Sequence, residues 1–224
     1  MLESRRVVGV KLEKILQEIQ VKLRGRDEAK ERVQNEMRRV LHLSKRAILL
    51  THEGRLDEAR SFLEDARGLL EGLGDVEYEE LAHIGLVNSA LQEYAEAHIF
   101  LGLVEGRGYT RPDEIKVPPI PYVLGLADVV GELRRRSLDL IRRGDFQGAE
   151  ECLHLMEEIY LGLTGMEDAY LLVPGLRRKC DVARRIIEAT RGDITIEARR
   201  ASLEDAIRRL EKLLREAGGG VEPG

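Results

Sequence analysis

The sequence has no tryptophan, and phenylalanine and tyrosine together supply only 4% of its 224 residues. Proteins that bind single-stranded nucleic acid by stacking its bases use a platform of aromatic side chains. The shortage of aromatics therefore argues against a stacking platform of this kind.

Cysteine is also scarce, because the chain contains only Cys152 and Cys180, with no CxxC spacing. This argues against a disulfide framework or a cysteine zinc site and predicts buried, reduced thiols. The first 14 residues lack the apolar core of a signal peptide, and no uncharged apolar run reaches the roughly 18 residues that a membrane span needs. These absences predict a cytoplasmic protein.

The chain has no excess of positive charge, since 36 Lys and Arg residues face 41 Asp and Glu residues, for a net charge of −5. Nucleic-acid binding would have to come from a local basic cluster rather than from the whole surface. Such a cluster can equally be an ordinary solvated face. The candidates form three groups in sequence: Lys22, Arg24 and Arg26; Arg134, Arg135 and Arg136; and Arg177, Arg178 and Lys179.

Apolar residues recur at steps of three and four along nearly the whole chain, and no alternating run is long enough to indicate a strand. The pattern predicts helices over residues 8–52, 56–73, 76–104, 122–143, 145–163, 167–190 and 196–217, a helical turn near Glu114 and a stiff non-helical connector over 117–121. Gly25 is placed to break or soften the first helix, and Asp145 is placed to cap the helix over 145–163. The fold class is therefore all-α, an antiparallel bundle of about seven helices with a further C-terminal helix.

The expected domain organisation is simple. Residues 1–195 form one helical domain, residues 196–217 form an amphipathic helix, and residues 218–224 form a flexible tail. The C-terminal helix carries Leu203, Ile207, Leu210 and Leu214 as a narrow heptad-like stripe. Such a stripe suits a cap on the bundle or a contact between subunits.

Two pairs of acidic residues lie in otherwise apolar surroundings. Glu93 and Glu96 are three residues apart and share one helix face, and the segment after them is apolar to Val104. Asp128 and Glu132 are four residues apart, and Asp128 is the one charged residue between Pro118 and Gly131. Because burying a carboxylate is costly without a cation or a donor, both pairs need a partner.

Two helices that each present two carboxylates can enclose a hard divalent cation. Mg²⁺ prefers oxygen ligands, keeps some of its waters, and can turn one of them into a nucleophile for phosphodiester hydrolysis. The competing explanation is that these acids form ion pairs with arginines such as Arg134, Arg135 or Arg136. The residues alone leave both interpretations open.

Residues 90–97 (ALQEYAEA) and 121–134 (PYVLGLADVVGELR) resemble the translin family, and specifically its catalytic branch, translin-associated factor X, in a prokaryotic or archaeal form. The resemblance extends through residues 137–145 and the helix over 179–191, and it covers roughly residues 10–195. It implies an all-α fold that assembles into a closed shell of identical subunits, a hexamer or an octamer.

The same resemblance implies a function. The catalytic branch supplies a Mg²⁺-dependent endoribonuclease, for which Mn²⁺ can substitute, and its acidic residues correspond to Glu93, Glu96, Asp128 and Glu132. The expected substrate is single-stranded RNA, with single-stranded DNA left open. Where translin itself has clustered arginine and histidine, residues 82–88 read AHIGLVN, so translin-like basic contacts are absent there.

Two other functions remain open. The first is a non-catalytic scaffold that binds single-stranded RNA or DNA. The second is a di-iron bundle, because Glu80 and His83, like Glu151 and His154, have the Glu-x-x-His spacing of such sites. Glutamate is abundant in this chain, so chance matches to that spacing are expected.

Overall fold

The computed structural model describes residues 12–73, 85–166 and 168–218, and all regular structure in these ranges is helical. The helices are α1 (Leu12–Glu53), α2 (Leu56–Glu71), α4 (Gly85–Val104), α5 (Pro119–Arg142), α6 (Phe146–Thr164), α7 (Ala169–Leu172) and α8 (Leu176–Gly218). The all-α prediction is confirmed. Of the predicted helix over 76–104, residues 76–84 lie outside the described ranges.

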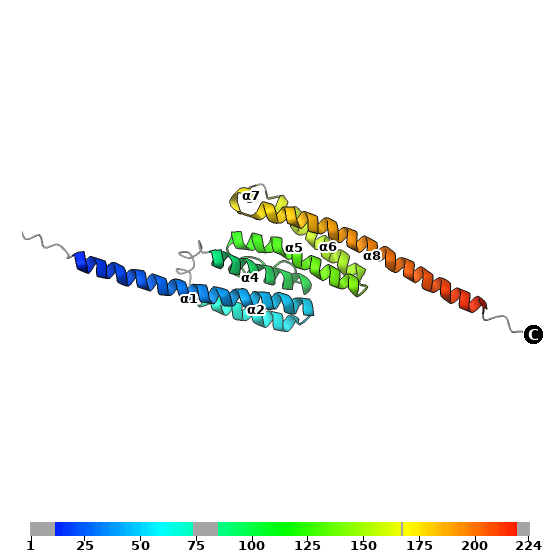
Figure 1. Ribbon diagram of the computed structural model, residues 1–224, viewed down its shortest axis with the longest axis horizontal. Coiled ribbons are helices and arrows are strands. Elements are labelled where there is room, and N and C mark those ends of the chain that lie inside the picture. Colours follow the sequence, from blue (N-terminus) through cyan, green and yellow to red (C-terminus); the bar gives the residue numbers. More distant parts are fainter. Residues whose placement is uncertain (1–11, 74–84, 167, 219–224) are drawn as a thin grey trace, which may run out of the picture.

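Helices α4 and α5 lie at the centre of the bundle, between α1 with α2 on one side and α6 with α8 on the other (Figure 1). The core is filled by large apolar side chains from each layer, among them Met37 of α1, Tyr94 and Phe100 of α4, Leu133 of α5 and Met156 of α6. Their burial removes apolar area from water, which is the main driving force for folding. The second half of α4 is mostly buried.

Helix α1 runs unbroken through Gly25. An interior glycine costs a helix only about 1 kcal/mol relative to alanine, which is too little to end a helix of 42 residues. The C-terminal half of α1 packs on the bundle through Val33, Met37, Val40 and Ala47, whereas its N-terminal part projects beyond the bundle (Figure 1).

The predicted boundary between the last two helices is wrong, because α8 is continuous from Leu176 to Gly218. The junction stays helical since Ile194 is buried and Asp193 is held by the Arg134 guanidinium at 3.1 Å. Residues 196–218 therefore extend α8 beyond the bundle, at the opposite end from the α1 projection (Figure 1). Both projections expose large apolar side chains, namely Leu12, Ile15, Leu16, Ile19 and Leu23 on α1 and Leu203, Ile207, Leu210 and Leu214 on α8.

Helix α5 begins three residues earlier than predicted, so the non-helical connector ends at Pro118. Proline is tolerated in the first turn of a helix, where its missing N–H has no partner in any case. The segment around Glu114 forms turns rather than a helix. At the next junction the prediction is confirmed, because Asp145 caps α6 by accepting a 2.9 Å hydrogen bond from the Gly148 N–H.

None of the described helices is both long and apolar enough to cross a membrane. Cys152 and Cys180 are buried and unpaired, as predicted.

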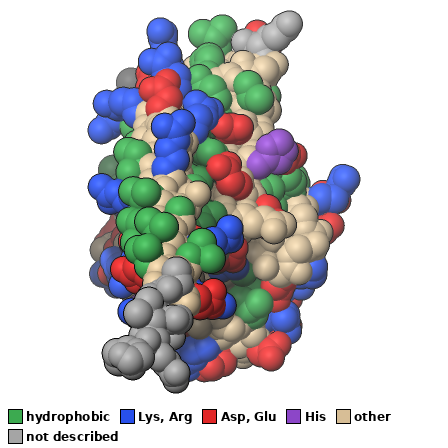
Figure 2. Space-filling view, turned by 90° about the vertical axis from the view of Figure 1, so that its right-hand side faces the viewer, with side chains coloured by type: hydrophobic (Ala, Val, Ile, Leu, Met, Phe, Trp, Pro, Cys, Tyr) green, Lys and Arg blue, Asp and Glu red, His purple; other side chains and the backbone are tan. Residues whose placement is uncertain are grey.

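Figure 2 shows lysine and arginine side chains interspersed with aspartate and glutamate over one end of the molecule. That end has no continuous basic face, which agrees with the net charge.

Candidate active site

Helices α4 and α5 are in close contact at Gly125. A Cβ atom at this position would lie 2.5 Å from the Gln92 carbonyl oxygen and 3.0 Å from the Glu96 nitrogen. Only the absence of a side chain therefore lets the two backbones come so near. Asp128 follows Gly125 by less than one turn, so this contact brings the acids of α5 beside those of α4.

We expect Gly125→Ala to lower the free energy of unfolding by about 2 kcal/mol, because overpacking a close contact costs about 1–3 kcal/mol. The matched control is Gly131→Ala on the same helix, where a Cβ meets nothing within 4 Å. There the gain in helix propensity should raise stability by up to about 1 kcal/mol. Denaturant unfolding measures both, and equal effects at the two positions would contradict this account of the contact.

The structure brings Glu93, Glu96, Asp128 and Glu132 together, and we call these residues the carboxylate cluster. Glu96 is only 7% exposed. Burial, followed by the charges of Asp128, Glu93 and Glu132, raises the pKa of its carboxyl to about 9. Burial also raises the pKa of half-buried Glu93, against the lowering effect of nearby Lys45. Each α4 acid thus senses both α5 acids, and burial is the larger reason that Glu93 and Glu96 favour the neutral form.

The acids of α5 have protein partners. The Lys179 ammonium of α8 forms an ion pair with Asp128, and the Gln92 amide donates to the other Asp128 oxygen at 2.5 Å. Nε2 of His52, from the end of α1, lies 2.6 Å from Oε2 of Glu132. Within the described residues, neither Glu93 nor Glu96 has a hydrogen-bond donor.

In the described part of the chain, no three His, Cys, Asp or Glu side chains are grouped closely enough to hold a metal ion. Among the four acids, Asp128 contacts Lys179 and Glu132 contacts His52. The chemistry of the donors nevertheless fits a hard cation, since all four side chains offer carboxylate oxygens. A cation would also offset the burial and the neighbouring negative charges that together raise the Glu96 pKa.

A groove of about 420 Å³ adjoins the cluster between α5 and α8. Asp128 and Gly131 line it from α5, and Arg178, Lys179 and Val182 line it from α8. The groove therefore places two cationic side chains next to one acid of the cluster, an arrangement suited to a phosphate group that approaches the carboxylates.

The basic residues predicted as nucleic-acid contacts are separated in space. Arg134 donates to Thr190 Oγ1 at 2.8 Å and pairs with Asp193, so it joins α5 to α8. Arg135 is exposed, and Arg136 lies beside Cys152. None of the three pairs with the carboxylate cluster, and the cation that pairs with Asp128 is Lys179 instead.

The other two basic groups differ in their distance from the site. Lys22, Arg24 and Arg26 are carried by the projecting part of α1, beyond the bundle (Figure 1). Arg177, Arg178 and Lys179 form the first turn of α8, where Arg178 and Lys179 line the groove. Only this last group is placed beside the carboxylate cluster.

Three residues at the site were not predicted from the sequence, namely Lys45, His52 and Gln92. Lys45 and His52 are seven residues apart on α1, so they lie on one face of the helix. That spacing was a usable signal, but nothing local in the sequence indicates that this face meets α4 and α5.

For the di-iron alternative, Glu151 and His154 are exposed on α6, and Glu80 and His83 lie outside the described residues.

Comparison with known proteins relates the chain to one family. Residues 76–190 match the translin family. An uncharacterised protein of Methanocaldococcus jannaschii is 33% identical over 131 residues, which cover 57% of this chain and 58% of that protein. Translin-associated protein X of Mus musculus is 25% identical over 187 residues, covering 65% and 64% of the two chains. The chain thus spans about three fifths of the length of these curated relatives.

Solved structures agree with this relationship. AfC3PO in a complex with duplex RNA is 36% identical, with a TM-score of 0.72 over 82% of this chain and 96% of that chain. Apo-NeC3PO has a TM-score of 0.75 over 84% and 100% of the two chains, and at 24% identity it supports the fold alone. With a family match over more than half of its residues and an architecture shared with these structures, the chain belongs to the translin family.

Proposed function

We propose that this protein is a divalent-cation-dependent endoribonuclease whose active site is the carboxylate cluster. The observation that carries the proposal is the convergence of four acids, Glu93, Glu96, Asp128 and Glu132, at the contact between α4 and α5. Glu96 is buried. Within the described residues, no Lys, Arg or His side chain forms an ion pair with Glu93 or Glu96. These side chains would hold Mg²⁺ or Mn²⁺ through their oxygens, with Glu93 able to serve as the general base instead of as a ligand.

A cation bound there supplies positive charge for the scissile phosphate and lowers the pKa of a water molecule. The protein's own residues do the rest. Glu93 is suited to accept the proton of the attacking water at its carboxylate, because it is half-buried, has a raised pKa and has no donor in the described residues. Arg178 and Lys179, in the groove beside Asp128, bind and orient the RNA phosphates.

The proposed substrate is single-stranded RNA, with single-stranded DNA as the alternative to test. The solved relative AfC3PO forms a complex with duplex RNA, so a duplex belongs in the same comparison. Positive charge at the groove comes from few residues, and a modest dependence of RNA affinity on salt concentration is therefore expected.

We also propose that the protein works as a closed assembly of identical subunits, a hexamer or an octamer. The support is the apolar surface on the two projections, for example Leu16 on α1 and Leu210 on α8, both more than half exposed in a single chain. Exposed apolar stripes of this length are typical of contacts between helices of different subunits.

A second candidate function is a non-catalytic scaffold that binds RNA. It is favoured by one observation: Asp128 and Glu132 already have partners in Lys179 and His52, so two of the acids are satisfied without a cation. The scaffold predicts RNA binding that neither needs a divalent cation nor leads to cleavage.

The deciding experiment uses the whole chain and an end-labelled single-stranded RNA, with duplex RNA and single-stranded DNA in parallel. We expect internal cleavage of the single-stranded RNA with Mg²⁺ or Mn²⁺ and none with EDTA. Asp128→Asn should lose the activity, which excludes a contaminating nuclease. RNA binding without cleavage under all cation conditions would overturn the nuclease proposal in favour of the scaffold.

A further inference from the structure

His52 is the one histidine in contact with the carboxylate cluster among the described residues. Its Nε2 atom lies 2.6 Å from Oε2 of Glu132, across 80 residues of sequence. The His52 side chain is 5% exposed, whereas the Glu132 side chain is 25% exposed. The buried member of this pair is thus the histidine, and the carboxylate is the more exposed of the two.

The surroundings hold the imidazole ring in place. The ring centroid is 4.8 Å from that of Phe100, which is fully buried on α4, and the two planes are tilted by 41°. His52 also stands in the last turn of α1, next to buried Thr51. The chain reverses directly after it through Gly54, at a φ of +78°, and the Arg55 N–H bonds back to the Leu50 carbonyl. Helix α1 therefore ends at the point where the ring meets α5.

The contact has a direction that matters for the site. A carboxylate is an acceptor, so the hydrogen bond requires that Nε2 of His52 carries the proton and donates it to Oε2 of Glu132. Oε1 of Glu132 receives no donor from the described residues. Groups that hydrogen-bond to one oxygen of a ligating carboxylate fix its orientation and influence metal affinity about 10–100-fold.

We propose that His52 is a positioning residue: by holding Oε2 of Glu132 it directs the other oxygen of that carboxylate toward the carboxylate cluster, and it thereby sets the affinity of the site for a divalent cation. This inference rests on the proposed function, since it takes Glu132 as part of a cation site. It assigns His52 no contact with the cation or with RNA.

The test measures Mn²⁺ binding to the whole protein by titration calorimetry and by the loss of the free-ion electron paramagnetic resonance signal, without RNA. His52→Leu keeps the apolar contact with Phe100 but removes the donor, and we expect it to weaken Mn²⁺ binding about 10-fold or more. His52→Gln places an amide nitrogen near the position of Nε2 and should restore most of the affinity. His42→Leu, at an exposed histidine on the same helix, is the control and should bind Mn²⁺ as the wild type does.

A double substitution separates positioning from a general structural effect. If His52 acts through Glu132, His52→Leu should have little further effect on Mn²⁺ binding in a Glu132→Gln background. An equal loss in both backgrounds, or no loss in His52→Leu, would overturn the inference. If His52→Leu does not fold, His52→Asn, whose shorter amide cannot reach Glu132, replaces it with the same expectations. Absence of Mn²⁺ binding by the wild type would instead refute the cation site itself, and the inference with it.

Discussion

Glu93→Gln is expected to lower the rate of RNA cleavage at least about 100-fold, which is the usual contribution of a positioned general base. The substitution keeps the shape of the side chain but removes both its negative charge and its capacity to accept a proton. Single-turnover cleavage of end-labelled RNA at saturating Mg²⁺ measures the effect on the chemical step, apart from any loss of cation affinity.

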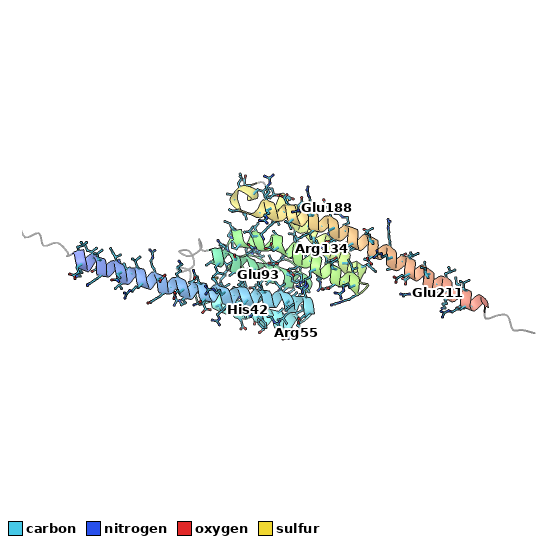
Figure 3. All side chains as sticks on the ribbon, in the orientation of Figure 1. His42, Arg55, Glu93, Arg134, Glu188 and Glu211 are labelled. Carbon is cyan, nitrogen blue, oxygen red and sulfur yellow. The ribbon has the colours of Figure 1, made fainter. Side chains whose placement is uncertain are left out.

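The same substitution should not destabilise the fold. Burial raises the pKa of Glu93, so the charged carboxylate is disfavoured in the folded protein, and a neutral glutamine should leave stability unchanged or raise it. The matched control is Glu188→Gln. Figure 3 places Glu93 on α4 in the middle of the bundle and Glu188 on α8, where it is exposed. Cleavage that is reduced equally in both variants, or that persists in Glu93→Gln, would contradict the role given to Glu93.

Glu96→Gln is expected to make the cation-free protein more stable at alkaline pH. The carboxyl of Glu96 has a pKa of about 9 in the folded protein, against an ordinary value of 4.5, chiefly because it is buried and secondarily because of Asp128, Glu93 and Glu132. Between these two pH values the folded chain binds a proton that the unfolded chain has released. The stability of the wild type therefore falls as pH rises through this window, by up to about 1.4 kcal/mol per pH unit.

Glutamine has no proton to lose, so the variant lacks this decline. We expect the two proteins to have similar free energies of unfolding near pH 4, and the variant to be more stable by about 3 kcal/mol at pH 8. Denaturant unfolding in EDTA across the pH range measures the difference. A constant difference at all pH values would show that Glu96 is not protonated in the fold. Addition of Mg²⁺ should stabilise the wild type more than the variant, because the cation favours the ionised carboxyl.

The sequence was informative about the acids because their spacing is a local property. Residues three or four apart on a helix necessarily share a face, so the spacing alone pairs Glu93 with Glu96, and Asp128 with Glu132. The lone charge of Asp128 in an apolar segment indicated that it needed a partner. Neither pattern indicates the identity of that partner, which is Lys179, 51 residues further along the chain.

The helix ends show the same difference between what local sequence indicates and what tertiary contacts decide. Asp145 was recognisable as a cap because its hydrogen bond joins neighbours in sequence. The start of α5 was misplaced because proline is equally compatible with a loop and with a first helical turn. The break expected before residue 196 does not occur, because Arg134 of α5 and the buried Ile194 hold the backbone helical there. Those are contacts with another layer, which local propensity does not encode.

By itself, the sequence determined the helical class, most helix positions and the two acidic pairs, since periodicity, caps and i to i+4 spacing act within a few residues. Tertiary structure alone decided that Gly125 brings the pairs together, that α1 and α8 bring His52 and Lys179 to two of the acids, and that Arg134 is engaged elsewhere. The physical reason is that burial and charge–charge interactions depend on distance in space. Helix packing sets those distances among residues that lie far apart along the chain.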